Sequence, residues 1–196
     1  MKNSINTKGI ILVVAMILVA SFSRIIPHFP NFTAVGAMAL FGSAYFSRKH
    51  LAIIAPLAAL WLSDLVINNT IYAEYNEGFV WFQSYQLYTF LPILLITIFG
   101  IVLFKKVNLQ RIFAGSITSS IVFFLISNFG TWASPFALFP KTMAGLIETY
   151  IFGLPFLRND LIGTLFFSAV MFGSYHFITK MYPGLSLRKT NAALLA

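Results

Sequence analysis

The amino-acid sequence predicts an all-α, polytopic membrane protein with six transmembrane helices. Hydrophobic residues make up 59% of the chain and charged residues only 9%, whereas a soluble domain carries about 25% charged residues. Long apolar runs are separated by short polar gaps, and Lys and Arg gather in every second gap. This alternation is typical of a chain that crosses a membrane several times.

The lengths of the apolar runs define the predicted spans. A membrane-crossing helix needs roughly 20 mostly apolar residues. Runs that approach this length occur at residues 9–22, 32–46, 51–67, 87–104, 112–126 and 161–179. The first two runs are short, so we expect them to extend into their flanks. At 196 residues, the chain is expected to form one integral membrane domain covering residues 1–196.

The distribution of basic residues predicts the orientation. Of the 13 Lys and Arg residues, ten lie in the gaps that share a side with the termini. Because basic loops stay in the cytoplasm, we expect both termini inside the cell and the chain in the inner (cytoplasmic) membrane. One alternative is a cleaved signal peptide, with Lys2 and Lys8 before the first run and a cleavage site at residues 19–21. Cleavage would leave five spans and an outside N-terminus.

The gap at residues 127–160 is long enough to contain structure of its own. Within residues 142–152, apolar side chains recur every three or four positions, at Met143, Leu146, Ile147, Tyr150 and Ile151. This spacing predicts a helix. Because Pro140 and Pro155 flank the segment, we expect a short interfacial or re-entrant helix on the outer face.

The segment after the first span is predicted to be a stiff, non-helical loop on the outer side. Pro27 and Pro30 remove backbone donors and disfavour helix, while Arg24, His28 and Asn31 supply polar groups. Irregular backbone at membrane depth persists only where it is buried in protein or lines a wet cavity. The segment therefore suits ligand capture, although a simple extracellular turn accounts for it equally well.

Asp64 is the only acid inside a predicted span. An acid within a membrane segment is a functional candidate, and its partner should be identified. Arg24 is the nearest plausible cation on the outer side, so one interpretation is a structural Arg24–Asp64 pair and the other is direct ligand contact by Asp64. Trp61, three residues earlier, lies on roughly the same helix face.

The outer end of the fifth span carries a second polar group of residues. Asn128 offers two donors and an acceptor, Gly130 permits close backbone approach, and Trp132 provides a stacking face. This combination favours an organic ligand. The alternative is a helix C-cap followed by an interfacial tryptophan.

The cytoplasmic half is rich in small residues. Ala55 and Ala59 are four positions apart, and small residues at this spacing let another helix approach closely. They are candidates for docking a partner subunit, with packing inside the monomer as the alternative.

The sequence lacks the residues that several classes of activity require. The chain has no Cys and no His-Glu-x-x-His, Gly-x-Ser-x-Gly or phosphate-binding Gly-x-x-x-x-Gly-Lys motif. We therefore predict no catalytic residues, no cofactor and no metal site. The formal charge of +8 is explained by membrane orientation, so we expect no nucleic-acid partner.

Three motifs carry a resemblance to known families: residues 30–42, Ser63-Asp64 and residues 127–130. With them, the chain resembles a family of bacterial integral membrane proteins of unknown function. More distantly, it is similar to substrate-binding S components of energy-coupling factor (ECF) transporters. That resemblance implies a six-helix bundle with both termini inside and a vitamin site under the outer loops. It also implies a transmembrane coupling subunit with ATPases as a partner.

The chain also departs from those S components. Their docking Ala-x-x-x-Ala motif is typically on the first helix, whereas here it is Ala55–Ala59 on the third span. The N-terminal Met1, Lys2 and Asn3 lack the histidine of cobalt and nickel members, and the absence of Cys disfavours a solitary cobalamin-type member.

These observations lead to one functional expectation and two alternatives. We expect a substrate-binding subunit of a small-molecule (vitamin or micronutrient) importer that takes its ligand from the outer face. The expected ligand-binding residues are Arg24, His28, Asn31, Phe32, Trp61, Asp64, Asn128 and Trp132. The first alternative is a structural or assembly protein in an envelope complex. The second, a membrane enzyme, requires His28, Asp64, Glu148 and Asp160 to converge.

Overall fold

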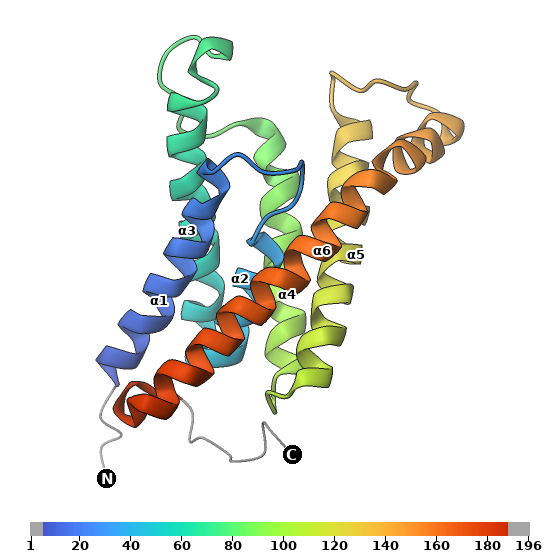
Figure 1. Ribbon diagram of the computed structural model, residues 1–196. Helices are drawn as coiled ribbons and strands as arrows, with labels where there is room; N and C mark the ends of the chain where they lie inside the picture. Colours follow the sequence, from blue (N-terminus) through green and yellow to red (C-terminus); the bar gives the residue numbers. More distant parts are fainter. Residues whose placement is uncertain (1–5, 188–196) are drawn as a thin grey trace.

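The computed structural model describes residues 6–187, and within this range the chain is helical, with no β-strand. Six α-helices are joined by loops and short 3₁₀ turns (Figure 1). Their bounds are α1 Thr7–Phe22, α2 Val35–Tyr45, α3 Lys49–Thr70, α4 Leu87–Leu103, α5 Leu109–Ala133 and α6 Met143–Met181. Five of these helices are long and apolar enough to cross a membrane, whereas α2 is shorter.

The start of α1 and the end of α6 lie at the same end of the molecule (Figure 1). The Asn6 side-chain amide donates to the carbonyl oxygens of Gly184 and Ser186, at 3.0 Å each, and so ties the two segments together. The turns between α2 and α3 and between α4 and α5 share this end, which we call the base. The base includes Arg48, Lys49, Lys105 and Lys106. The predicted concentration of basic residues beside the termini is therefore a feature of the fold.

Helix α2 forms the centre of the bundle. All eleven of its residues are buried, and it packs against α1, α3, α4, α5 and α6. The predicted span at residues 32–46 is wrong as a full crossing helix, because eleven residues rise only about 16 Å against a hydrocarbon core of about 30 Å. Residues 26–34 are not helical, so the chain leaves the end of α1 as an irregular segment that leads to α2 near mid-height (Figure 1).

Small residues allow α2 to pack this closely. A Cβ atom on Gly100 of α4 would lie only 2.1 Å from the Ser43 hydroxyl of α2, so only glycine fits there. Ala55 and Ala59 of α3 also pack inside the bundle. Ala59 is buried, and its carbonyl accepts a 2.7 Å hydrogen bond from Ser21 of α1. Within this chain, Ala59 thus lies in the α1–α3 contact, and Ala55 packs at the edge of the core.

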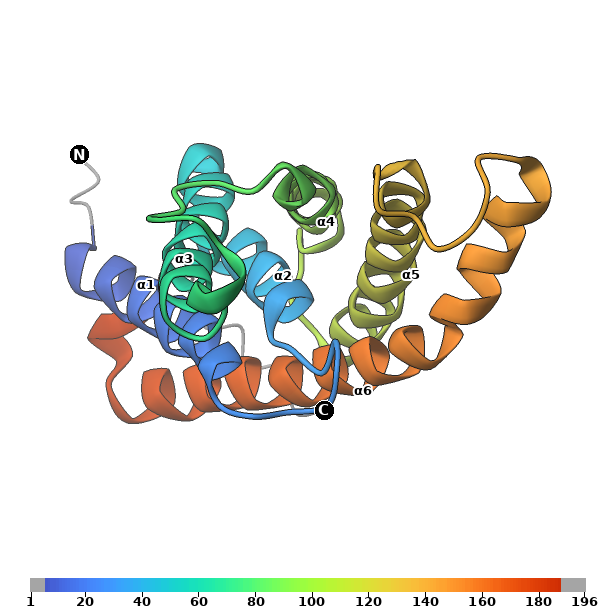
Figure 2. The ribbon, with the colours of Figure 1, turned by 90° about the horizontal axis from the view of Figure 1, so that it is seen from above.

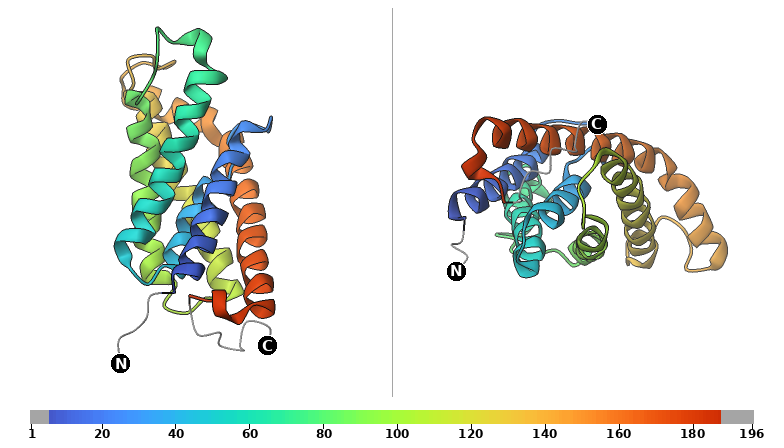
Figure 3. Two further views of the ribbon diagram at one scale, coloured as in Figure 1. Left: turned by 90° about the vertical axis from the view of Figure 1, so that its left-hand side faces the viewer. Right: turned by 90° about the horizontal axis from the view of Figure 1, so that it is seen from below.

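Helix α6 is a single helix of 39 residues. It includes the separate helix predicted at residues 142–152, the span predicted at 161–179, and Pro155 between them. The expected break at Pro155 is therefore wrong, because proline removes one backbone hydrogen bond but need not end a membrane helix. At about 58 Å, α6 is longer than a membrane is thick. It bends in its first half and then runs along one side of the bundle to α1 (Figures 2 and 3).

The outer faces of the long helices are apolar. On α4 alone, Leu91, Leu95, Ile98 and Val102 are exposed at successive turns, and Val102 is 63% exposed. Apolar surface on this scale is unfavourable in water and suits contact with lipid. The structure thus agrees with a membrane protein whose helices pack around α2 and face lipid on the outside.

Candidate functional site

Polar groups gather in two places in the half of the bundle away from the base. One is a hydrogen-bonded network between α1, α3 and the start of α4. The other is a cavity between α4, α5 and α6. Of the eight residues expected to form one ligand site, two lie in the network, two line the cavity and four lie in neither.

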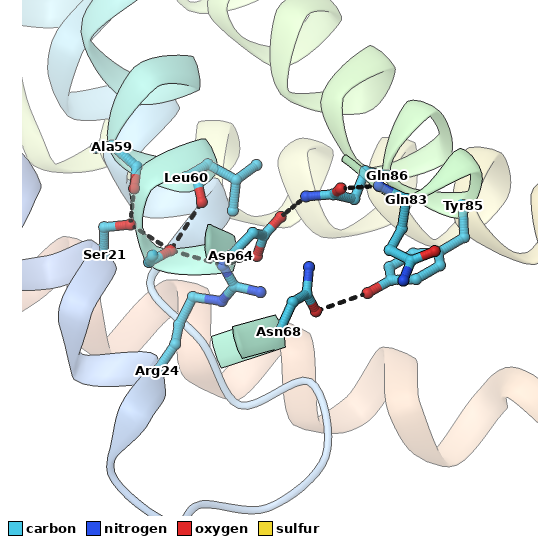
Figure 4. Close-up of polar contacts among 10 residues, drawn as sticks. Ser21, Arg24, Ala59, Leu60, Asp64, Asn68, Gln83, Tyr85 and Gln86 are labelled. Carbon is cyan, nitrogen blue, oxygen red and sulfur yellow. Dashed lines mark hydrogen bonds and ion pairs between the residues drawn. The ribbon is translucent and has the colours of Figure 1, made fainter. Parts of the chain in front are cut away.

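The network is built around the ion pair of Arg24 and Asp64 (Figure 4). Arg24 Nη1 lies 2.6 Å from Asp64 Oδ1 and donates a 2.8 Å hydrogen bond to Ser63 Oγ. The second carboxylate oxygen of Asp64 accepts a 2.7 Å hydrogen bond from Gln86 Nε2. Both side chains of the pair are mostly buried, with 18% of Arg24 and 9% of Asp64 exposed. The structural pair considered from the sequence is therefore present.

A second set of contacts extends this network into the loop between α3 and α4. Tyr85 Oη donates to Asn68 Oδ1 at 3.2 Å, and Gln83 Nε2 donates to Asn76 Oδ1 at 2.7 Å. Asn76 Nδ2 in turn donates to the Asn68 carbonyl oxygen. The network thus fixes the loop and the first turn of α4 against α3.

The cavity has a volume of about 410 Å³ and its lining contains no charged side chain. Six lining residues are polar and neutral, and five are large and apolar. The lining residues are Asn31 before α2, Thr89 of α4, Phe123, Ser127, Asn128 and Thr131 of α5, Leu138 and Phe139 of the α5–α6 loop, and Thr149, Phe152, Gly153 and Phe156 of α6. Such a lining suits a neutral molecule with an aromatic or aliphatic body and a few polar groups.

Asn31 holds a special backbone conformation beside the cavity. Its φ of 62° lies in the left-handed region, which Asn tolerates better than most residues. Its carbonyl accepts a 3.0 Å hydrogen bond from the Thr33 N–H, and the neighbouring Pro30 carbonyl accepts one of 3.0 Å from Asn159 of α6. The loop is therefore pinned to α6, and Asn31 is presented to the cavity by a defined turn.

Asn128 is the amide at the wall between α5 and α6. Its Nδ2 donates to the Phe124 carbonyl oxygen at 2.9 Å, while its Oδ1 points at Gly153, where a Cβ atom would lie 2.3 Å away. In the described part of the chain, Asn128 Oδ1 accepts no hydrogen bond. Glycine at position 153 thus leaves room for the Asn128 amide oxygen between α5 and α6.

Four other expected ligand residues lie outside the cavity lining. His28 is exposed, with Nδ1 2.6 Å from the Ile26 carbonyl oxygen. Phe32 packs on two phenylalanine rings of α6, each 5.8 Å away. Trp61 Nε1 donates to the Trp81 carbonyl oxygen. Trp132 Nε1 donates to the Pro140 carbonyl oxygen, and the Lys141 ammonium lies over its ring. The structure places all four in contacts that hold loops.

The α6 part of the lining was missed from the sequence. Thr149, Phe152, Gly153 and Phe156 follow the i, i+3, i+4, i+7 spacing of one helix face. Treating Pro155 as a break divided that face between two elements. Thr89 was missed for a different reason, because a single threonine in an apolar helix carries no distinguishing pattern.

The residues required by the enzyme alternative do not converge. His28 and Glu148 are exposed, Asp64 belongs to the ion-pair network, and Asp160 is buried in α6. Within residues 6–187, no three His, Asp or Glu side chains lie close enough to hold a metal ion. Among the described residues, these four side chains therefore do not form one site.

Comparison with known proteins gives one result. Residues 4–185 match a family of unknown function, DUF6580, and the chain belongs to this family. No curated protein and no solved structure matches the chain.

Proposed function

We propose that this member of the DUF6580 family captures a small uncharged organic molecule in the cavity between α4, α5 and α6. In this proposal the chain is the substrate-binding subunit of an importer for a vitamin or similar micronutrient. The observation that carries the proposal is the cavity itself, at about 410 Å³ with a neutral, partly aromatic lining.

The size and chemistry of the cavity support a small organic ligand. Small-molecule sites commonly measure about 300–1,000 Å³ and combine apolar walls with a few polar groups. Phe123, Phe152 and Phe156 offer ring faces, and Asn31 and Asn128 offer amides. A charged ligand would lack an opposite charge here, so the proposed ligand is neutral in the part that enters the cavity.

The location of the cavity supports uptake from outside. It lies away from the base, where basic residues are concentrated, and basic segments stay in the cytoplasm. In the inner membrane this orientation opens the cavity outward. Because the sequence has no phosphate-binding glycine-rich motif, energy for transport would come from a partner, which we propose to be a transmembrane coupling subunit with ATPases.

The ion-pair network has a supporting role in this proposal. Gln86 is anchored by Asp64, and Thr89, one helical turn later on α4, lines the cavity. Arg24 and Asp64 therefore position one wall of the site. The ligand is contacted by Asn31 and Asn128 instead.

The proposal is tested by the melting temperature of the purified protein in detergent with a panel of water-soluble vitamins. We expect at least one compound to raise the melting temperature, because a ligand that binds only the folded state stabilises it. Asn128→Leu, which keeps the side-chain size but removes the amide, should abolish the shift. Thr70→Val, at an exposed site on α3, should keep it.

Two outcomes would contradict the proposal. One is a panel in which no compound shifts the wild-type melting temperature. The other is a shift that survives in Asn128→Leu unchanged. Stable co-purification with a non-transport complex would then favour the structural or assembly role.

A further inference from the structure

Four buried side-chain oxygen atoms between α5 and α6 make no well-formed hydrogen bond within the described residues. They are Ser119 Oγ and Ser120 Oγ of α5, and Asp160 Oδ2 and Thr164 Oγ1 of α6. None of the four residues is more than 4% exposed. Buried polar groups are almost always paired, so a group of unpaired ones requires an explanation.

These atoms form one cluster. Asp160 and Thr164 are four residues apart and share a face of α6, and the Ser120 hydroxyl lies close enough to the Asp160 carboxylate for a weak side-chain hydrogen bond. Ser119 Oγ and Thr164 Oγ1 both face Gly36 in the first turn of α2, at 2.4 Å and 3.0 Å from the position of a Cβ atom. The hydroxyls of Ser119 and Thr164 therefore lie where α5 and α6 meet the first turn of α2.

The irregular backbone before α2 passes beside this cluster. The Thr33 nitrogen and Phe32 Cα lie 2.9 Å and 3.1 Å from the position of a Cβ atom on Gly163, the residue before Thr164. In membrane transporters, irregular backbone buried at membrane depth contributes to sites where coupling ions bind, and here such backbone lies beside a buried acid. The cluster combines both features.

The charge of Asp160 needs a counter-charge. The other buried acid, Asp64, has Arg24 at 2.6 Å, whereas Asp160 makes no ion pair with any residue between 6 and 187. An isolated buried carboxylate is strongly unfavourable. Its neighbours are hydroxyl oxygens, which suit hard cations, and a monovalent ion balances a single carboxylate.

We propose that Asp160, Ser119, Ser120 and Thr164 form a binding site for a sodium ion. This site is separate from the organic-ligand cavity and does not depend on it. The two are nevertheless adjacent, because Phe123 and Phe156 of the cavity lining lie about one helical turn from Ser120 and Asp160.

The test compares melting temperatures of the purified protein in NaCl, KCl and choline chloride at equal ionic strength and fixed pH. A sodium ion bound only to the folded state should raise the melting temperature in a saturable way. The expected shift is about 3–5 °C at ten times the dissociation constant. Equal melting curves in the three salts would overturn the proposal, including the case in which a proton alone neutralises Asp160.

Single substitutions test whether the sodium-dependent shift in melting temperature arises at this site. Asp160→Asn removes the charge at nearly constant volume and should abolish the sodium-dependent shift. The matched control is Asp64→Asn, which changes the other buried acid and should lower the melting temperature while keeping the sodium-dependent shift. Thr164→Val removes one ligand oxygen and should raise the half-saturating sodium concentration at least threefold, which provides a second reading if Asp160→Asn does not fold. A full sodium shift in Asp160→Asn, or an unchanged half-saturation in Thr164→Val, would overturn the site.

Discussion

Asp64 and Asp160 are both acids buried within helices, and they differ in the groups that surround their carboxylate oxygens. Asp64 has a guanidinium on one oxygen and an amide on the other. Asp160 has no cation beside it among residues 6–187, and its polar neighbour is the Ser120 hydroxyl. At the scale of single residues, the first arrangement is that of a structural contact, and the second is the one at which we propose an ion site.

The first prediction concerns Arg24. Arg24→Met removes the cation and leaves the Asp64 carboxylate buried without its counter-charge, so we expect a loss of about 3 kcal/mol in the free energy of unfolding. Equilibrium unfolding of the purified protein in detergent measures this loss. The double variant Arg24→Met/Asp64→Leu should recover most of it, because no charge then remains buried. A double variant as unstable as the single one would contradict this account.

The second prediction concerns Gly153. A Cβ atom here would lie 2.3 Å from Asn128 Oδ1, so Gly153→Ala should displace the amide and abolish the ligand-induced shift in melting temperature. The stability without ligand should change by less than about 1 kcal/mol, because alanine favours helix. Gly173→Ala on the same helix, where nothing lies within 4 Å, is the control and should keep the ligand shift. Loss of the shift in both variants would contradict a local role.

At the scale of elements, the packing of α2 against α4 depends on Gly100. Gly100→Ala places a Cβ atom 2.1 Å from Ser43 Oγ and 2.9 Å from its Cβ. Overpacking of this kind costs about 1–3 kcal/mol, measurable as a lower melting temperature. Ser43→Gly in the same chain removes both contacts and should restore part of the loss. If Gly100→Ala is as stable as the wild type, α2 and α4 are not in close contact.

Elements that depend on local composition were predictable, and elements that depend on tertiary contact were not. The runs at 51–67 and 87–104 correspond closely to α3 and α4, because their hydrophobicity reports contact with lipid. The short α2 is also apolar, but for a different reason, since it is surrounded by other helices. Composition cannot distinguish a helix that faces lipid from one buried in protein.

The candidate site was predictable only in part for the same reason. Asn31 and Asn128 were selected because polar groups beside apolar runs are conspicuous, and both line the cavity. Trp132 was equally conspicuous but binds its own loop. Thr149 is an ordinary residue in sequence. It lines the cavity only because α6 continues through Pro155, which no local pattern indicates.

At the scale of the whole molecule, the fold separates a basic base from a half that contains the cavity and the ion-pair network. Such a division is the expected result when one end faces the cytoplasm, where basic residues are retained. The basic residues of the base come from more than one turn of the bundle. Their separation from the cavity is therefore a property of the whole chain and of no single helix.

The last prediction concerns the orientation of the chain, in which the base faces the cytoplasm. Because the chain has no native Cys, introduced cysteines can measure this orientation directly. Glu77→Cys places a thiol in the exposed loop between α3 and α4, and Lys106→Cys places one in the exposed turn between α4 and α5. A membrane-impermeant maleimide should label Glu77→Cys in intact cells or spheroplasts and should label Lys106→Cys only after permeabilisation. The wild-type chain, which should remain unlabelled, is the control. The reverse labelling pattern would place the cavity on the cytoplasmic side, and capture of a ligand from outside would then be impossible in this orientation.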